Sequence, residues 1–592
     1  MGTLDYIVIV IYFVGLIAVS LMMSRRIRNS EDMFIAGRNS SWWLSGISSY
    51  MTIFSAGTFV VWGGVAYKSG LVAVVVALCV GVASLIVARW ISGKWRQINI
   101  KSPGEYLTIR FGHTTVGFYT ISGIITRAVH TATALYAVAI VMCALVEVPS
   151  DCVFASTGFP GDSAAGHLGI WWALLMLGAI TLAYTIAGGF LAVLMTDVIQ
   201  FGVLLSVVVF MIPLSLDAVG GIGNFIGEAS AIPAFFSGTS PNYSWTWLML
   251  WTILNVGMIG GDWPFVQRYI SVPTVKDAKK STYLIGFLYL VTPLIWYLPT
   301  MAYRLIEPGT GFDTAAMTYA GEHAYVEMSK LVLMQGMIGL MIAAMLSATL
   351  SNVSGILNVY ANVYTYEIWG RKKRNLHCGE AKKIRIGRIF TLFFGVAIVL
   401  LAMLVPLVGG AEKVVVTLLT LVMCPLYIPS IWGLFSKRLS GNQLIWTMVA
   451  TWTVSILSKL FVPSSVIHAN ICEALCGCVL PLFILTSIEV ISAVRGKRQQ
   501  GFDDLQSYQN PNTESIGEND KESVRSYSHM AISCFCITIG IIALLLVALL
   551  AAGDPKTLAV KSIVWWFIGS ILATILAYMI YRKIERQQHE CR

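Results

Sequence analysis

Four ionisable side chains lie inside stretches that are otherwise strongly apolar. Asp197 lies in AVLMTDVIQFG and Asp262 in IGGDWPF, whereas Arg127 and His130 both lie in TRAVHTATALYA. The spacing of three places Arg127 and His130 on one face of a helix. Ionisable groups in such surroundings are costly and usually mark an ion or solute pathway. A structural hydrogen bond is the weaker alternative for Asp197, whereas for Arg127 we favour a side chain that either snorkels to the membrane surface or forms a structural ion pair. For His130 we favour simple packing over a proton relay.

A second group of candidates is a row of small and polar residues in AAMLSATLSNVSGILN. Positions i, i+3, i+4 and i+7 of one helix face hold Ala348, Ser351, Asn352 and Gly355. Hydroxyl and amide oxygens on one face suit a hard cation such as sodium. Hydrogen bonding between helices would use the same residues, and the spacing alone does not separate the two interpretations.

A third stretch combines glycines with hydroxyl residues in the middle of an apolar segment. Its small and polar members are Gly46, Ser48, Ser49, Thr52, Ser55, Gly57 and Thr58. Glycines alone would indicate close packing of helices. The added hydroxyls favour a break in the helix, because freed carbonyl groups are costly in lipid unless they bind an ion or a solute.

The residue patterns of enzymes are missing from the sequence. It has no phosphate-binding loop, no zinc-ligand spacing and no nucleophile elbow. Of the eleven Cys, Cys472, Cys476 and Cys478 lie close together in an apolar stretch, where Cys behaves as a small hydrophobic residue. We therefore expect no enzyme activity and no ATP-driven chemistry from this chain, which leaves an ion gradient as the natural energy source.

Membrane-spanning helices are the elements that must position these residues. Hydrophobic residues make up 57% of the chain and charged residues 12%, whereas soluble domains carry about 25% charged residues. The mean hydropathy is +0.74. Windows of roughly 20 apolar residues predict about fifteen spans. They lie at 4–23, 42–66, 70–92, 114–146, 169–187, 189–215, 244–263, 282–303, 329–369, 387–408, 412–435, 441–462, 468–493, 529–552 and 561–581.

Charge in the connecting loops predicts the orientation of the spans. Lys and Arg gather in alternate loops, among them Arg25, Lys94, Arg268, Lys276, Lys437, Arg495 and Arg582. Such loops lie in the cytoplasm, so we expect the N-terminus outside and the C-terminus inside. The net charge of +10 belongs to this pattern, and we expect no nucleic-acid partner. The first apolar run carries its Arg residues behind it, which indicates a retained helix rather than a signal peptide.

Four stretches, taken in order, resemble the sodium:solute symporter family of sodium/sugar, sodium/proline and sodium/pantothenate carriers. They are DMFIAGRNSSWWLSGISSYMTIFSAGTF, AGGFLAVLMTDVIQ, DWPFVQRYISVPTVKDAKKS and AAMLSATLSNVSGILNVYANVYTYEIW. The resemblance extends over roughly residues 5–480. It implies an all-α polytopic membrane protein with a LeuT-like inverted repeat of five plus five helices, and alternating access around a midplane site.

This fold would divide the chain into six parts. They are 1–41, a leading helix and loop; 42–215, the first repeat; 244–435, the second repeat; 436–498, peripheral helices; 499–528, a linker; and 529–592, a helical hairpin with a cytoplasmic tail. The polar composition of residues 499–528 predicts a disordered cytoplasmic segment.

The resemblance also implies ligands for a transported sodium ion. They are the backbone carbonyls of Met51, Phe54 and Ala348 with the side chains of Ser351 and Asn352. The family usually has Ser or Thr where this chain has Asn352. A possible second sodium or proton site maps onto Asp197 and Ser354, but Gly355 lacks the hydroxyl group that this site would need. We therefore predict one sodium ion per transport cycle.

Residues after the helix break are implied to bind the solute. Where sugar carriers of the family have Glu-Gln, this chain has Gly57 and Thr58, and where they have Asn it has Asp262, followed by Trp263. A buried carboxylate could pair with a cationic or zwitterionic solute. Trp263 could gate or stack, with a structural role at the helix end as an equal alternative.

Together these features imply sodium-coupled symport of a small organic solute, such as a sugar, amino acid or small carboxylate. The partners would be that solute and the lipid bilayer, and the location the plasma membrane, most simply a bacterial inner membrane. A proton-coupled symporter and a transport-inactive solute sensor with the same fold are the alternatives. The sequence implies no particular oligomeric state.

Overall fold

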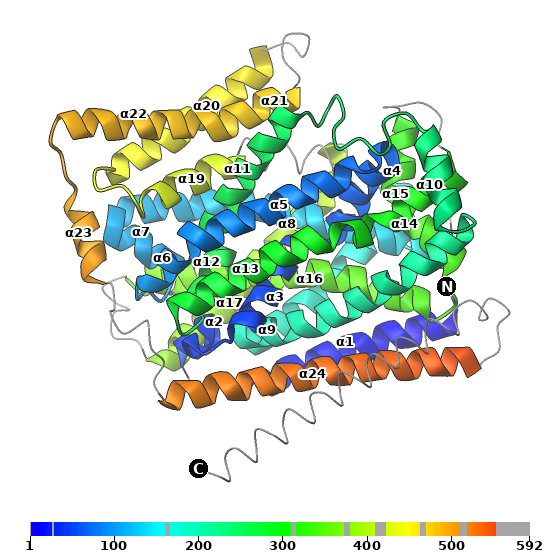
Figure 1. Ribbon diagram of the computed structural model, residues 1–592. Coiled ribbons are helices and arrows are strands. Elements are labelled where there is room, and N and C mark those ends of the chain that lie inside the picture. Colours follow the sequence, from blue (N-terminus) through cyan, green and yellow to red (C-terminus); the bar gives the residue numbers. More distant parts are fainter. Residues whose placement is uncertain are drawn as a thin grey trace, which may run out of the picture.

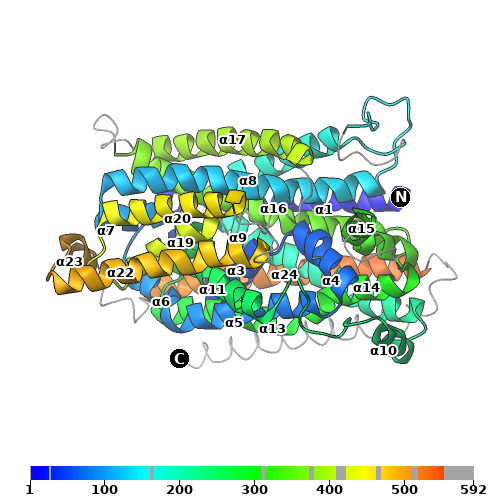
Figure 2. The same ribbon diagram turned by 90° about the horizontal axis from the view of Figure 1, so that it is seen from above.

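The computed structural model is a bundle of helices. It describes residues 2–25, 29–159, 166–308, 315–371, 379–408, 422–461, 469–508 and 518–551. Within these ranges it contains helices and three isolated β-bridges but no strand. Most of the long helices run along one common direction, horizontal in Figure 1, and Figure 2 shows the same bundle from above.

Eight helices in the described part of the chain are long and apolar enough to cross a membrane, or nine if one bent pair counts as a span. The expected all-α polytopic architecture is therefore confirmed. The number of about fifteen spans and their orientation stay predictions, and the expected span at 561–581 lies outside the described residues. The expected repeat and domain boundaries also stay predictions.

The helices differ widely in length. The long ones are α1 (Thr3–Ser24), α5 (Val72–Trp90), α8 (His113–Leu145), α9 (Ile170–Ala218), α13 (Val275–Val291), α14 (Pro293–Ile306), α16 (Met337–Val363), α17 (Glu380–Leu404), α20 (Gly441–Phe461), α22 (Leu480–Val494) and α24 (Glu518–Ala551). A further long helix is α15 (Ala315–Val332), and the shorter ones include α2 (Ser30–Ile35), α6 (Ser92–Gln97), α7 (Pro103–Phe111) and α19 (Cys424–Trp432). Gly189, with a φ of +58°, lies inside α9, where two separate spans meet in the sequence prediction. Glycine adopts this backbone conformation without steric cost.

The break predicted in the second span is present. Helix α3 (Trp42–Ile53) is followed by the π-helix η2 (Thr58–Trp62) and α4 (Gly63–Ser69), and the two halves are bent by 61°. Side-chain oxygens satisfy amides that the break frees. The Ser55 amide lies 3.4 Å from Thr58 Oγ1, and the Gly57 amide donates to Ser55 Oγ over 3.2 Å.

A second break lies at Asp262. Helix α11 (Trp245–Gly261) ends there because Asp262 has an extended conformation, with φ −73° and ψ 133°. Helix α12 (Trp263–Ile270) follows at once, with Pro264 in its first turn, where a proline needs no amide partner. Both breaks interrupt apolar helices, an arrangement that transporters use around a central site.

Helix α16 occupies the centre of the bundle. Its most apolar stretch is completely buried, and the helix contacts α9, α1, α8 and α3. Asp5 of α1 caps its beginning, because Asp5 Oδ1 accepts hydrogen bonds of 2.6 Å from Gly336 N and 2.8 Å from Gly339 N. A carboxylate is favourable at the positive end of a helix. Asp5 thereby ties the beginning of α16 to α1.

The stretch 499–528, predicted to be a disordered linker, is helical in part. Helix α23 (Gln500–Ser507) lies inside it, and α24 begins at Glu518, while 509–517 lie outside the described residues. Phe502 and Leu505 of α23 are buried, and α23 contacts α7. Two apolar residues one turn apart thus give this polar helix a buried face, and backbone hydrogen bonds from Asn99 N to Tyr508 O and from Gln499 N to Lys437 O hold its two ends.

Candidate functional site

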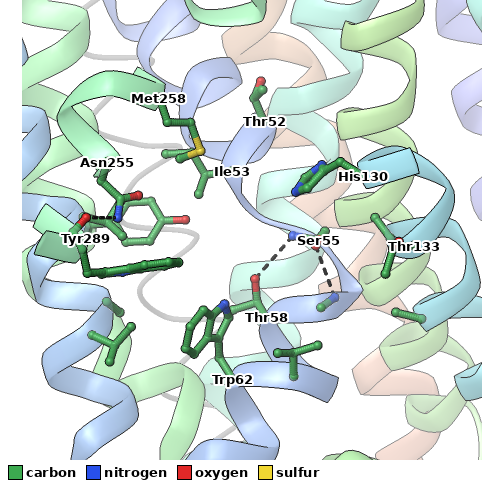
Figure 3. Close-up of a pocket in the computed structure, with 18 of the residues that line it drawn as sticks. Thr52, Ile53, Ser55, Thr58, Trp62, His130, Thr133, Asn255, Met258 and Tyr289 are labelled. Carbon is green, nitrogen blue, oxygen red and sulfur yellow. Dashed lines mark hydrogen bonds between the residues drawn. The ribbon is translucent and has the colours of Figure 1, made fainter. Parts of the chain in front are cut away.

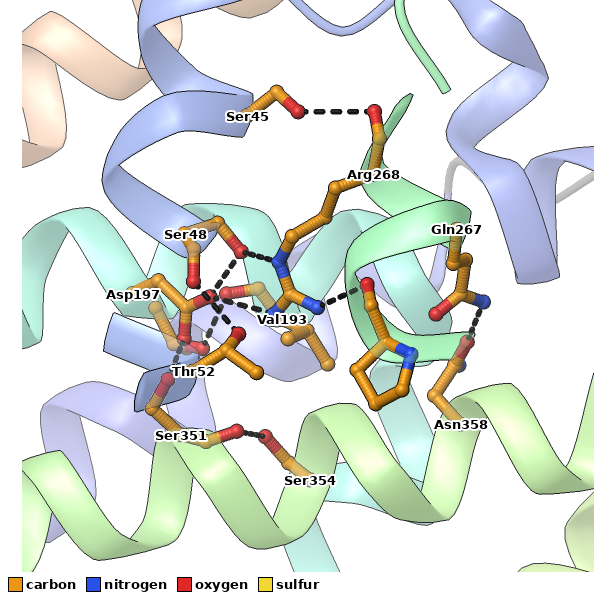
Figure 4. A network of polar contacts seen from close by, with 12 residues as sticks. Ser45, Ser48, Thr52, Val193, Asp197, Gln267, Arg268, Ser351, Ser354 and Asn358 are labelled. Carbon is orange, nitrogen blue, oxygen red and sulfur yellow. Dashed lines mark hydrogen bonds and ion pairs between the residues drawn. The ribbon is translucent and has the colours of Figure 1, made fainter. Parts of the chain in front are cut away.

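A buried ion pair joins Asp197 of α9 to Arg268 of α12, and two hydroxyl groups complete it (Figure 4). Arg268 Nη2 lies 3.5 Å from Asp197 Oδ2, and both side chains are fully buried. Ser351 Oγ of α16 donates to Asp197 Oδ1 over 2.6 Å, and Ser48 Oγ of α3 donates to Oδ2. Four helices therefore meet at one carboxylate.

The expectation that Arg268 lies in a cytoplasmic loop is wrong. The residue is part of α12, and its side chain points into the bundle, where Nε donates to Ser48 Oγ over 2.8 Å and Nη1 to Pro264 O over 2.9 Å. The prediction used only the local charge of each loop. It could not take account of the ion-pair partner Asp197, which is 71 positions away in the sequence. The expected burial of Asp197 could have predicted a cationic partner, because a buried carboxylate is stable only when a positive charge lies close to it.

The residues expected to bind sodium lie on α3 and α16, which contact each other. Phe54 N donates to Tyr50 O at the end of α3, whereas the next amide, that of Ser55, points to Thr58 Oγ1. The carbonyls of Met51 and Phe54 therefore lie where regular helix pairing ends.

On α16, Ala348 and Ser351 are fully buried, and Asn352 is 2% exposed. Asn352 Oδ1 is buried without a hydrogen-bond partner. Leaving such an acceptor unpaired is costly, and a cation would satisfy it. Ser354, expected at a second site, donates to the Ser351 carbonyl over 3.0 Å within its own helix.

A cavity of about 110 Å³ lies beside the break between α3 and α4 (Figure 3). Its polar lining includes Thr52, Ser55, Thr58, Arg127, His130, Thr133 and Asn255, and its aromatic lining Trp62, Trp251, Tyr289 and Tyr297. The expected solute residues Gly57 and Thr58 line this cavity, whereas Asp262 and Trp263 are not among its lining residues. Trp263 is 2% exposed, and its ring stacks on that of Tyr119 with the centroids 5.2 Å apart.

Asp262 reaches the cavity indirectly, through Arg127. The two side chains form a buried ion pair in which Arg127 Nε lies 3.2 Å from Asp262 Oδ1, with 4% and 1% of their surfaces exposed. The interpretation of Arg127 as part of an ion pair is confirmed. His130 Nδ1 lies 3.4 Å from Arg127 Nη1, and both residues line the cavity. The sequence alone did not connect Arg127 with Asp262, which lies 135 positions away.

Comparisons with known proteins agree with this architecture. The chain is 26% identical to the sodium/sialic acid symporter NanT of Aliivibrio fischeri over 486 residues, which cover 78% of this chain and 88% of that protein. It is 23% identical to the mouse sodium/glucose cotransporter 1 over 495 residues, or 76% of this chain and 71% of that protein. A solved structure, the substrate-bound outward-open state of a Na+-coupled sialic acid symporter, shares the fold. The TM-score is 0.66 at 18% identity, over 84% of this chain and 99% of that one.

The model of one protein family matches most of the chain. It is described as the sodium:solute symporter family, and the match covers residues 33–450, which include both helix breaks, Asp197 and the polar face of α16. The chain therefore belongs to the sodium:solute symporter family, and it is a multi-pass membrane transporter that couples sodium to the symport of a small organic solute.

Proposed function

We propose that sodium binds between the α3 break and α16, and that the solute binds in the cavity beside that break. The sodium ligands would be the carbonyls of Met51, Phe54 and Ala348 with the side-chain oxygens of Ser351 and Asn352. The observation that carries this proposal is the unpaired and buried Asn352 Oδ1. A buried amide oxygen without a donor is a suitable ligand for a hard cation, and the longer side chain replaces the family's usual hydroxyl.

The cavity favours a compact polyhydroxylated solute, of the sugar or sugar-acid class. Hydroxyl groups, the amide of Asn255 and aromatic rings all line it, which suits a molecule that has both polar edges and an apolar face. Its volume of about 110 Å³ is small beside the pockets of drug-sized ligands. The named relatives transport sialic acid and glucose, and both molecules fall within this class.

The ion pair with Arg127 changes the role proposed for Asp262. The carboxylate is already neutralised by the guanidinium, so it offers no free charge to a cationic solute. We infer that Asp262 positions Arg127, whose remaining N–H groups are available to hydroxyl or carboxylate oxygens of the solute. Trp263, stacked on Tyr119, supports the packing of α12.

We further propose a plasma membrane location, in the inner membrane of a bacterium. The multi-pass architecture requires a membrane, and one similar transporter is bacterial. Expression of a tagged chain in a Gram-negative host, followed by separation of inner and outer membranes, tests this assignment. Recovery of the protein with the outer membrane would contradict it.

Uptake into proteoliposomes tests the sodium and solute assignments together. Labelled glucose, myo-inositol, N-acetylneuraminate and a panel of amino acids are offered under an inward sodium gradient and under an equal potassium gradient. We expect uptake of one sugar-class solute in sodium only. Uptake that is equal in the two salts would contradict sodium coupling, and uptake of an amino acid alone would contradict the solute class.

Substitution of Asn352 tests the sodium ligands. We expect Asn352→Leu to raise the sodium concentration for half-maximal uptake by roughly tenfold, the equivalent of about 1.4 kcal/mol. Thr453→Ala is the matched control, because Thr453 is exposed on α20 and its hydroxyl group bonds only the Val449 carbonyl four residues earlier. An unchanged sodium dependence in Asn352→Leu would remove Asn352 from the site.

A further inference from the structure

A second cavity, with a volume of about 240 Å³, lies between α1 and α24. It is a groove that shares no lining residue with the cavity beside the α3 break. Both helices pack on α9 but have few contacts with each other in the described part of the chain, and both run along the lower edge of the bundle in Figure 1. Side chains of α9 and α16 complete the lining.

The lining of this groove offers no free hydrogen-bonding group to a polar ligand. The hydroxyl group of Tyr12 is hydrogen-bonded to Ser347 Oγ of α16, and Thr538 Oγ1 donates to the Cys534 carbonyl over 2.8 Å. Apart from the thiol of Cys534, which behaves as a weakly polar group, the other lining residues are apolar. A hydrocarbon chain therefore fits the groove, whereas a sugar or an ion would lose its hydration there without compensation.

The groove is elongated along α1. Its lining on this helix extends from Val8 to Met22, which is about 20 Å at a rise of 1.5 Å per residue. The hydrocarbon core of a bilayer is about 30 Å thick, so one leaflet contributes about 15 Å. Gly15 lies between these ends, and a Cβ atom added there would have no heavy atom within 4 Å. The length and the open space at Gly15 suit an extended acyl chain.

One end of the groove carries a positive charge. Arg25 follows the lining residue Met22 by three positions, directly after the end of α1, and its side chain is exposed. Arg26 and Arg28 come next in the sequence. The planar guanidinium group binds phosphate well, and basic residues just beyond a membrane helix attract anionic lipids. Charge at this end therefore complements an anionic headgroup.

We propose that the groove binds an anionic phospholipid, with one acyl chain between α1 and α24 and the phosphate group at Arg25. Acyl chains of the bilayer reach a lipid-facing groove directly, and the lining chemistry, the length and the terminal charge all match such a molecule. The lipid completes the seat of α24, whose main protein contact is with α9. This inference does not depend on the proposed sodium and solute sites, because the groove lies apart from them.

Lipid retained by the purified full chain is the first test. Native mass spectrometry from a mild detergent counts the bound lipids, and extraction identifies them. We expect one anionic phospholipid per chain. Gly15→Phe places a ring in the open space and should lower the retained lipid several-fold. Val14→Phe is the matched control, because Val14 is exposed and does not line the groove. Equal retention in the two variants would overturn the proposal.

Replacement of Arg25 tests the headgroup. The protein is equilibrated in detergent with equal amounts of phosphatidylglycerol and phosphatidylethanolamine, and the ratio of the two retained lipids is measured. We expect phosphatidylglycerol to predominate in the unmodified protein, and the ratio to fall several-fold in Arg25→Gln. An unchanged ratio in this variant would remove the phosphate group from Arg25. Equal retention of both lipids by the unmodified protein would overturn the anionic class.

Photo-cross-linking identifies the occupant without filling the groove. A benzophenone amino acid replaces Ile11, a lining residue that is 53% exposed, and membranes that contain the full chain are irradiated. We expect a phospholipid adduct on the α1 peptide. An adduct with a peptide from residues 552–592, or with a second chain, would show a protein segment in the groove and overturn the proposal. This experiment decides the matter even if Gly15→Phe does not fold.

Discussion

The Thr349 hydroxyl group on α16 accepts a hydrogen bond of 2.9 Å from the Ala56 amide at the α3 break. Both residues are fully buried. The bond satisfies one of the backbone groups that the break frees, and it does so between the two halves of the proposed sodium site. Met51 and Phe54 precede Ala56 in the chain, and Ala348 precedes Thr349. The bond therefore connects α16 directly to the break, beside which the cavity lies.

Thr349→Val should weaken both sites, because it leaves the Ala56 amide buried and unpaired, at a cost of about 1–3 kcal/mol. We expect a lower thermal stability and a sodium requirement raised by roughly a factor of five or more. Thermal unfolding in detergent and sodium-dependent uptake measure the two effects. Thr349→Ser keeps the acceptor and should remain close to the unmodified protein. If the two variants behave alike, the hydrogen bond between Thr349 and Ala56 does not couple α16 to the α3 break.

The sequence predicts the parts of the site that depend on local pattern. The break near Ser55 follows from glycines and hydroxyls at mid-span depth, and the structure places it there. The buried position of Asp197 follows from its apolar surroundings, and the deep burial of the Ser351 face follows from its helical spacing. Each of these features is encoded within about ten residues, the range over which periodicity is informative.

The parts that the sequence does not predict depend on tertiary partners. Arg268 was assigned to a loop because several Lys residues follow it closely in the sequence, and only its pairing with Asp197 reveals the burial. Asp262 was expected to face a solute, but Arg127 neutralises it. Helix α23 was expected to be disordered, because Phe502 and Leu505 are two apolar residues in a largely polar stretch. Their burial depends on the contact of α23 with α7, which the local sequence does not show.

Asp262→Asn should destabilise the protein, because it leaves Arg127 as an unpaired charge in the interior. Breaking one side of a buried ion pair costs about 3–5 kcal/mol. The double variant R127M/D262L should recover most of this stability, since an apolar pair of similar size is tolerated. Solute uptake should not recover, because Arg127 lines the cavity. Recovery of uptake in the double variant would argue against Arg127 as a solute-binding residue.

Phe502→Ala should release α23 from α7 without unfolding the bundle. Phe502 is 8% exposed, and its ring centroid lies 5.7 Å from Arg110 Cζ, while the ring of Phe111 lies 4.6 Å from the same atom. Loss of this contact removes up to about 3 kcal/mol of local stabilisation. Limited proteolysis should cut the chain between α22 and α24 faster. Gln506→Ala is the control, since Gln506 is exposed on the same helix, and it should leave the cleavage rate unchanged.

Cys424 of α19 and Cys478 of the π-helix η7 (Leu475–Val479) should behave as a pair of thiols. Their Sγ atoms lie 3.4 Å apart, and both residues are fully buried. A trivalent arsenical such as phenylarsine oxide binds two thiols and releases water, and here it would bridge α19 to the neighbouring helix. Because α19 belongs to the expected second repeat, which moves during alternating access, we expect uptake to fall and to be restored by a competing dithiol. Cys478→Ser should resist the reagent, whereas Cys472→Ser should stay sensitive, which distinguishes this pair from the nearby Cys472 and Cys476. Inhibition that persists in Cys478→Ser would place the reactive thiols elsewhere.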